Sequence, residues 1–152
     1  MSTWSKLGYP MVEAEPPKYE KEYDLEVGSI APDFTVTDID GREFSSKEHS
    51  RNLVLAFLLP GCHPCSEQVD VLENVYEDYP QVSIFFVGRS SEYLKNIRKR
   101  GFEGCYFSTN AGLKDKYEVN GYPTTYILRE NNLIKFKSRG VASYSEIVQF
   151  LE

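Results

Sequence analysis

The sequence predicts an α/β protein with a central mixed β-sheet. A continuous apolar run at residues 53–59 and a second buried strand at 82–87 are each followed by an amphipathic stretch, so a strand followed by a helix occurs twice. Further along the chain, two short strands joined by a turn precede a last helix. Strands that alternate with helices pack as layers, and we therefore expect helices to flank the sheet.

A β-hairpin is expected at the amino end of the domain. Residues 33–38 alternate apolar and polar side chains, and Asp40-Gly41 marks a tight turn before residues 42–44. The apolar run at 53–59 is then bounded by polar and turn residues. Such a run is typical of a central strand that is buried on both faces.

Two amphipathic helices follow the two apolar strands. Between residues 64 and 77, apolar side chains recur at intervals of three and four, with acidic residues mostly on the other side. After the strand at 82–87, Ser90 or Ser91 is expected to cap a helix that ends near Gly101. Each helix therefore begins shortly after the carboxyl end of a buried strand.

Short elements complete the predicted domain. They are expected at 105–107 (strand), 110–117 (helix), 124–128 (strand), 133–137 (strand) and 143–151 (helix). Asn110 is expected to cap the first of these helices, and Ser143 with Glu146 forms a capping box for the last. Asn120-Gly121 and Asn131-Asn132 supply the turns that separate the strands.

Length and charge narrow the class of protein. A single domain is expected, since a chain of 152 residues buries roughly 68–70% of its unfolded surface and so has a core of its own. Three cysteines are too few for a fold that disulfides hold together. With 17 Lys and Arg against 23 Asp and Glu, the net charge of −6 argues against nucleic acid and anionic membranes as partners.

The domain is expected at residues 26–152, preceded by an extended arm or linker at residues 1–25. The arm holds three prolines and scattered apolar residues without a period, of which Trp4, Tyr9 and Met11 are candidates for docking on the domain. The first 30 residues lack the apolar core of a secretory signal, and no apolar run approaches the ~20 residues that span a bilayer. We expect no transmembrane segment, and either a cytosolic protein or one whose leader is absent from this chain.

The motif that carries chemistry is Cys62-His63-Pro64-Cys65, which lies where the first buried strand ends and a helix begins. Unpaired backbone N–H groups and the positive end of the helix dipole lower the pKa of a thiol there, so that the thiolate becomes a nucleophile. The second cysteine, one turn into the helix, can reach back and close a disulfide. Pro64 lies in the first turn, where its missing N–H costs nothing.

Other roles of the cysteines remain open from the residues alone. A structural zinc site needs four ligands, and beyond the motif the chain offers only Cys105 and His49. An inert pair of core cysteines is the other alternative. Cys105, followed by Tyr106 and Phe107, is expected to be a small buried hydrophobe, with a regulatory thiol or an intermolecular disulfide as the alternative.

Four separated segments form a further pattern. They are Ala31-Pro32-Asp33-Phe34 with Asp40-Gly41, Gly61-Cys62-His63-Pro64-Cys65, residues 117–128 around Pro123, and Arg139-Gly140. With these segments, over about residues 26–152, the chain resembles the thioredoxin-fold thiol-disulfide oxidoreductases of the TlpA and cytochrome-c-maturation type. The resemblance implies a thioredoxin-like fold, in which helices flank a central mixed sheet and a β-hairpin extends the amino end.

The resemblance also implies an activity. Cys62 would be the attacking thiol and Cys65 the resolving thiol of an enzyme that exchanges electrons with protein disulfides or dithiols. The Tyr122–Pro123 peptide would be cis and lie against the disulfide, presenting a backbone edge to an incoming chain. An ordinary trans proline that opens a strand is the alternative. Neither a cofactor nor a metal is expected.

Several further residues are assigned to the site by the same resemblance. Those expected to border the substrate are Gly61, Tyr122 and Thr124, and those expected to tune the redox pair are His63, Pro64 and Pro123. His63, if protonated or as a donor, would stabilise the Cys62 thiolate and so make the dithiol more oxidising. The alternative is an exposed histidine with little influence.

The chain departs from the family pattern at three positions. Gly61 stands where many relatives have Trp, and Ala56 where thioredoxin has a buried Asp. Gln68, three residues after the second cysteine, stands where TlpA-type proteins often have Glu. Glu67 is therefore the remaining candidate for the proton acceptor of Cys65, against a solvated position on the helix face.

Other functions compete with disulfide exchange. A peroxiredoxin-like thiol peroxidase shares the fold, but that family has Thr three residues before its catalytic cysteine, where this chain has Leu59. A copper-binding protein would use the two thiolates with a distal His, and no His follows His63. A redox sensor, in which the cysteine pair only switches an interface, is the third alternative.

The expected partners and location follow from disulfide exchange as the expected function. We expect a monomer that meets protein thiol or disulfide substrates and a redox partner protein. TlpA-type proteins mostly work outside the cytoplasm on an amino-terminal anchor, which favours a periplasmic or membrane-tethered protein whose leader is absent here. Met1 without an apolar stretch after it favours the cytoplasm.

Overall fold

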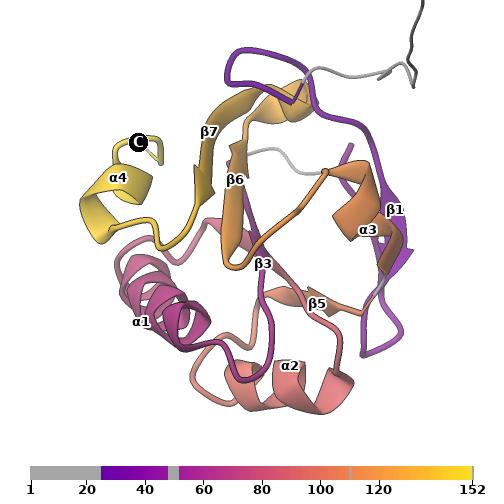
Figure 1. Ribbon diagram of the computed structural model, residues 1–152, viewed down its shortest axis with the longest axis vertical. Helices are drawn as coiled ribbons and strands as arrows, with labels where there is room; N and C mark the ends of the chain where they lie inside the picture. The colour runs from indigo at the N-terminus through magenta and orange to yellow at the C-terminus, as the bar shows by residue number, and fades with distance from the viewer. Residues whose placement is uncertain (1–24, 48–51, 110, 152) are drawn as a thin grey trace, which may run out of the picture.

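The computed structural model describes residues 25–47, 52–109 and 111–151, which are organised around a five-stranded sheet (Figure 1). The strand order is β5-β4-β3-β6-β7, and β1 pairs with β2 in a separate antiparallel sheet. The elements are β1 Thr35–Thr37, β2 Glu43–Ser45, β3 Leu53–Phe57, α1 His63–Asp78, β4 Ser83–Val87, α2 Ser91–Arg98, β5 Tyr106–Ser108, α3 Ala111–Lys116, β6 Thr124–Leu128, a 3₁₀ turn Glu130–Asn132, β7 Ile134–Arg139 and α4 Tyr144–Val148. Because β3 is parallel to β4 and antiparallel to β6, the sheet is mixed, as the sequence predicts.

Two layers cover the sheet. Helices α1, α2 and α4 lie on one face, and α3 with the β1–β2 hairpin lies on the other (Figure 1). All five residues of β3 are buried, and their side chains alternate between the faces: Val54 and Ala56 pack towards α1, and Leu53, Leu55 and Phe57 pack towards the hairpin. The continuous apolar run in the sequence therefore reflects burial on both faces.

The predicted elements are present, with shifts of a few residues at their ends. The strand predicted at 53–59 ends at Phe57, and β7 continues to Arg139 because Arg139 still pairs with Thr124 of β6. The helix predicted to run to Leu151 ends at Val148. Beyond it, the N–H groups of Phe150 and Leu151 bond to carbonyls three residues back, which makes a tighter turn.

Side-chain caps confirm two helix starts. Ser90 accepts a hydrogen bond from the Tyr93 N–H at 3.2 Å, and Ser143 with Glu146 forms the predicted capping box. The predicted cap Asn110 lies outside the described residues. None of the helices in the described part of the chain has the length and apolar character needed to cross a bilayer.

The start of the domain is visible at Leu25. This side chain is 5% exposed and packs in the hairpin-side core, the buried cluster between the sheet and the β1–β2 hairpin. The predicted arm at 1–25 otherwise lies outside the described residues, as do Trp4, Tyr9 and Met11. The arm therefore stays a prediction, and the folded domain includes at least Leu25.

Candidate active site

The chain enters the site from the carboxyl end of β3. After a short connection, Gly61 has φ +79°, a left-handed conformation that glycine adopts without steric cost. This turn delivers Cys62 to the cap position of α1. Pro64 lies in the first turn of the helix, as the sequence predicts.

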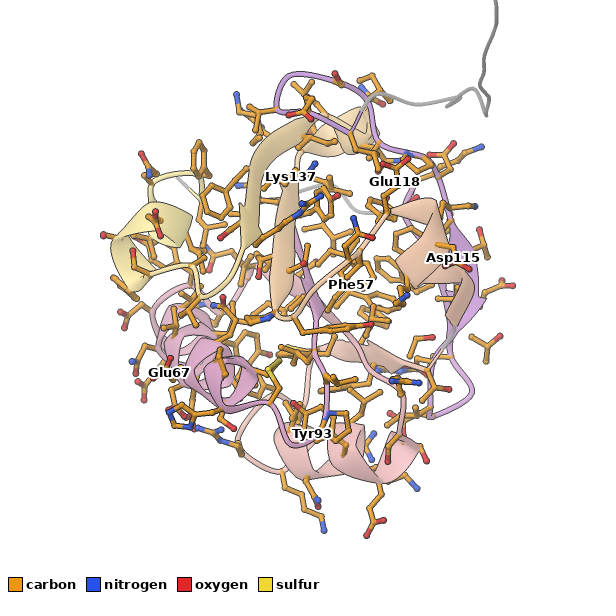
Figure 2. The ribbon with its side chains drawn as sticks, viewed as in Figure 1. Phe57, Glu67, Tyr93, Asp115, Glu118 and Lys137 are labelled. Atoms are coloured by element: carbon orange, nitrogen blue, oxygen red, sulfur yellow. A yellow bond between two sulfur atoms is a disulfide. The ribbon has the colours of Figure 1, made fainter. Side chains whose placement is uncertain are left out.

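Cys62 and Cys65 form a disulfide at the amino end of α1 (Figure 2). Their Cα atoms are 5.2 Å apart, within the usual range for a disulfide. The Cys62 sulfur also accepts a hydrogen bond from the Cys65 N–H, with an N–S distance of 3.2 Å. In the reduced protein this N–H group faces a thiolate, which it stabilises together with the helix dipole.

The two sulfurs differ in exposure. Cys62 is half-buried, whereas Cys65 has none of its surface exposed. Cys65 packs in the α1-side core, the buried cluster between the sheet and the helices α1, α2 and α4. An incoming sulfur can therefore reach Cys62 and not Cys65. The site has one accessible sulfur and one that can act only from within the protein.

The loop before β6 closes the other side of the disulfide. The Tyr122–Pro123 peptide bond is cis, the isomer that the sequence analysis expects, and the Tyr122 carbonyl oxygen lies 3.9 Å from the Cys62 sulfur. Pro123 is buried, and its carbonyl accepts a hydrogen bond from the Gly140 N–H. Thr124 is 2% exposed and its hydroxyl donates to the Gly121 carbonyl, so this side chain is not available to a substrate.

His63 and Glu67 form an exposed pair on the first turns of α1. The His63 Nε2 and Glu67 Oε2 atoms are 3.5 Å apart, and the side chains are 85% and 54% exposed. Residues two apart on a helix point to different sides, so Glu67 faces His63 rather than Cys65. The geometry does not bring the predicted proton acceptor to Cys65, and that role stays a prediction.

Gln68 is a buried structural link between α1 and the segment before α4. Its amide nitrogen donates to the Ala142 carbonyl at 3.1 Å, and its amide oxygen accepts from the Ala142 N–H at 2.7 Å. Both ends of the amide are therefore occupied. A neutral side chain that is held in this way positions the backbone and supplies no proton acceptor.

Thr125 is a feature that the sequence analysis did not single out. It pairs directly with Ala56 across β3 and β6, so both side chains lie on the face that α1 covers. Within the described residues, its hydroxyl is the one buried side-chain polar atom without a hydrogen-bond partner. Threonine is common in strands, so the sequence contains no signal for this position.

Cys105, the third cysteine, lies just before β5. It is 1% exposed and packs in the α1-side core, as the sequence predicts for a small buried hydrophobe. Burial raises the pKa of its thiol to about 12. A thiol in this state is protonated at neutral pH.

The described residues hold no cluster of metal ligands. Over residues 25–47, 52–109 and 111–151, no three His, Cys, Asp or Glu side chains come together in a group that could hold a metal ion. His49, a candidate zinc ligand in the sequence, lies outside these ranges.

The comparisons with known proteins agree with this geometry. The model of the AhpC/TSA family matches residues 27–137. The thioredoxin-like protein YneN of Bacillus subtilis is 28% identical over 141 residues, which cover 88% of this chain and 83% of that protein. The thiol-disulfide oxidoreductase ResA of Geobacillus thermodenitrificans is 29% identical over 134 residues, which cover 83% of this chain and 76% of that protein.

A solved structure shares the fold. The thioredoxin domain of a thiol-disulfide oxidoreductase from Bacteroides vulgatus superposes with a TM-score of 0.68 at 22% sequence identity. The match covers 85% of this chain and all of that domain. The chain therefore has the thioredoxin-like fold that its sequence predicts.

Proposed function

The chain belongs to the AhpC/TSA family, and we propose that it is a thiol-disulfide oxidoreductase that acts on protein disulfides or dithiols. The observation that carries the proposal is the Cys62–Cys65 disulfide at the amino end of α1, in which Cys62 is accessible and capped by an N–H group. The name of the relative ResA, a thiol-disulfide oxidoreductase, supports the same activity.

The exchange takes place in two steps that conserve electrons. In the reducing direction, the Cys62 thiolate attacks one sulfur of a substrate disulfide, forms a mixed disulfide and releases the other substrate sulfur as a thiolate. The Cys65 thiolate then attacks the Cys62 sulfur, breaks the mixed disulfide and releases the second substrate sulfur. The two electrons that reduce the substrate come from the two cysteines, which end as the disulfide.

A redox partner protein must restore the pair after each turnover, because the chain holds one disulfide and the exchange is stoichiometric. We propose that this protein is a monomer. We also propose that it meets its substrate and its redox partner outside the cytoplasm, as the TlpA-type proteins that the chain resembles mostly do. The direction of electron flow follows from the reduction potential of the pair. A value near about −270 mV would indicate a reductant, and one near about −120 mV an oxidant.

Disulfide reduction tests the proposal directly. With insulin as the substrate and dithiothreitol as the reductant, we expect wild-type protein to accelerate insulin reduction and the Cys62→Ser variant to lose this activity. Cys65→Ser protein that is reduced and then freed of dithiothreitol before insulin is added should stop at a mixed disulfide, which non-reducing mass spectrometry would detect. Cys105→Ala is the matched control and should turn over like wild type. A Cys62→Ser variant as active as wild type would contradict the proposal.

A thiol peroxidase is the competing function, and the same proteins separate the two. Leu59, three residues before Cys62, is half-buried and apolar, so it offers no hydroxyl to a peroxide. We expect the wild type to consume hydrogen peroxide far more slowly than it reduces insulin. The reverse order of rates would favour the peroxidase.

A further inference from the structure

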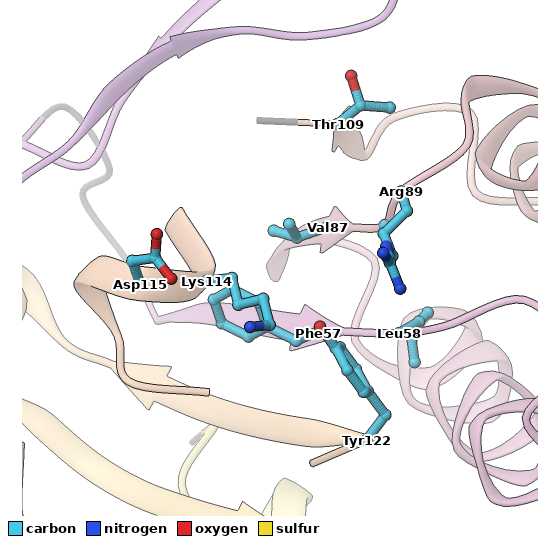
Figure 3. A pocket seen from close by; sticks show the side chains of 9 residues that line it. Phe57, Leu58, Val87, Arg89, Thr109, Lys114, Asp115 and Tyr122 are labelled. Carbon is cyan, nitrogen blue, oxygen red and sulfur yellow. The ribbon is translucent and has the colours of Figure 1, made fainter. Parts of the chain in front are cut away.

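A pocket of about 530 Å³ lies at the carboxyl ends of β3 and β4 (Figure 3). Phe57 and Leu58 from the end of β3, Val87 from β4 and Tyr122 from the loop before β6 form its apolar lining. Its volume lies within the range that is usual for ligand sites. The proposed chemistry at the two sulfurs does not use this pocket.

Charged side chains stand at the edge of the pocket. Arg89 follows β4, and Lys114 and Asp115 belong to α3; all three are exposed (Figure 3). Neither Arg89 nor Lys114 forms an ion pair or a side-chain hydrogen bond with another described residue. Two cations and one carboxylate leave an excess positive charge here, on a chain whose net charge is −6.

Tyr122 connects the pocket to the site of exchange. Its side chain lines the pocket, and its carbonyl oxygen lies 3.9 Å from the Cys62 sulfur. An extended chain advances about 3.3 Å per residue and points alternate side chains to the same face. On a substrate whose cysteine reacts with Cys62, the side chain two positions away therefore lies about 6.6 Å from that cysteine and on the same face.

We propose that this pocket is a specificity site for protein substrates, and that it binds an aromatic side chain two positions from the reactive cysteine together with an Asp or Glu two positions beyond the aromatic residue, on the same face of the extended chain. The ring fits the apolar lining, where large planar side chains bury the most area. The carboxylate on the same face meets Arg89 and Lys114, which have no partner of their own among the described residues. This inference rests on the proposed disulfide exchange and names the class of substrate for it.

Short cysteine peptides, each joined to 2-thiopyridine through a disulfide, provide the test. One carries Phe two positions from the cysteine and Glu two positions beyond the Phe; a second has Lys in place of Glu, and a third has Ala in place of Phe. The Cys62 thiolate attacks the peptide sulfur, 2-thiopyridone leaves and is followed by absorbance, and the Cys65 thiolate then releases the peptide thiol. We expect the first peptide to react about three- to tenfold faster than the second at low salt, since two exposed ion pairs are at stake.

The charge variant locates the effect. In Arg89→Glu/Lys114→Glu, the ratio of the rates of the first two peptides should fall to one or reverse. The matched control Arg129→Glu changes an exposed cation at the far end of β6 and should keep the wild-type ratio. Added salt should reduce the wild-type ratio, because exposed charges are screened.

Two different failures remain distinguishable. Equal rates for all three peptides, or a ratio that the double variant leaves unchanged, would overturn the specificity site. Hydroxyethyl disulfide is neutral and lacks both side chains, so it reports exchange alone. Failure of the wild type to reduce even this disulfide would overturn the proposed function itself.

Discussion

Cysteine side chains occur in two different regions of the molecule, in the redox pair at the amino end of α1 and at Cys105 before β5. Cys62 caps α1, is half-buried, and its sulfur accepts a hydrogen bond from a backbone N–H. Cys105 lies before β5, 1% exposed among apolar side chains, and burial raises the pKa of its thiol to about 12. Cys65 is as deeply buried as Cys105, but it lies one helical turn from Cys62 and is bonded to it.

The difference shows that burial alone does not decide what a cysteine does. A helix terminus offers unpaired N–H groups that favour the thiolate, whereas an apolar environment favours the neutral thiol. Cys65 joins the chemistry because its neighbour lies at the terminus. Cys105 has no cysteine within reach and remains a packing residue.

The largest expected contrast is in alkylation rate. In the reduced native protein at neutral pH, we expect iodoacetamide to modify Cys62 at least about 10³ times faster than Cys105, because a pKa near 12 leaves few thiolates and burial blocks access. Time-resolved peptide mapping measures both rates. In denaturant the two should react alike, and similar rates in the native state would remove the contrast.

A smaller effect is expected in the pH dependence of stability. The pKa of Cys105 is about 12 in the folded protein and near 8.5 when unfolded, so the unfolded state loses this proton first as pH rises. The stabilisation is complete below about pH 8.5 and is lost towards pH 12. Between about pH 9 and 11, a protein with Cys105 should lose about 1.4 kcal/mol more per pH unit than its Cys105→Ala variant.

Urea unfolding at several pH values measures this slope. A Cys62→Ser/Cys65→Ser background removes the other thiols, so that the difference between the two proteins reports Cys105 alone. Tyr76, whose side chain hydrogen-bonds to Cys105, is replaced by Phe in both proteins, and the other tyrosines titrate alike in both and cancel. Parallel stability profiles would show that the Cys105 thiol is not held in its neutral form by the fold.

The smallest expected effect concerns the buried hydroxyl of Thr125, which lies on the same side of the sheet as Cys105. Thr125→Val removes the hydroxyl that has no partner in the described part of the chain, and should raise the free energy of unfolding by about 1 kcal/mol. Thr124→Val is the matched control, because that hydroxyl donates to the Gly121 carbonyl; it should lower stability by about 1 kcal/mol. Equal effects of the two substitutions would contradict this interpretation.

Sequence patterns predicted most of the elements but not their ends. The apolar run 53–59 marks the central strand, although pairing ends at Phe57. The last helix begins at the predicted capping box and ends three residues early, because its final N–H groups bond in a tighter turn. Capping is set by neighbouring side chains, whereas helix and strand ends depend on what the next turn packs against.

The sequence likewise predicted only part of the candidate site, namely the part whose residues are neighbours along the chain. The motif around Cys62 is local in the chain, and the structure agrees with its place at a helix terminus. Thr124 was expected to border the substrate, and its side chain is buried instead. Arg89 and Lys114 carry no signal in the sequence, since exposed cations are common on any surface.

By itself the sequence determined the succession of strands and helices along the chain, the place of the cysteine pair at a helix terminus and the burial of Cys105. These properties follow from residues that are neighbours along the chain, through apolar periodicity and helix capping. Only the tertiary structure decided that Gln68 holds Ala142, 74 residues away, and that Arg89 and Lys114 line one pocket with Tyr122. Such contacts depend on strand order and packing between layers, which no local pattern encodes, and they give the site its edge, its pocket and its charge.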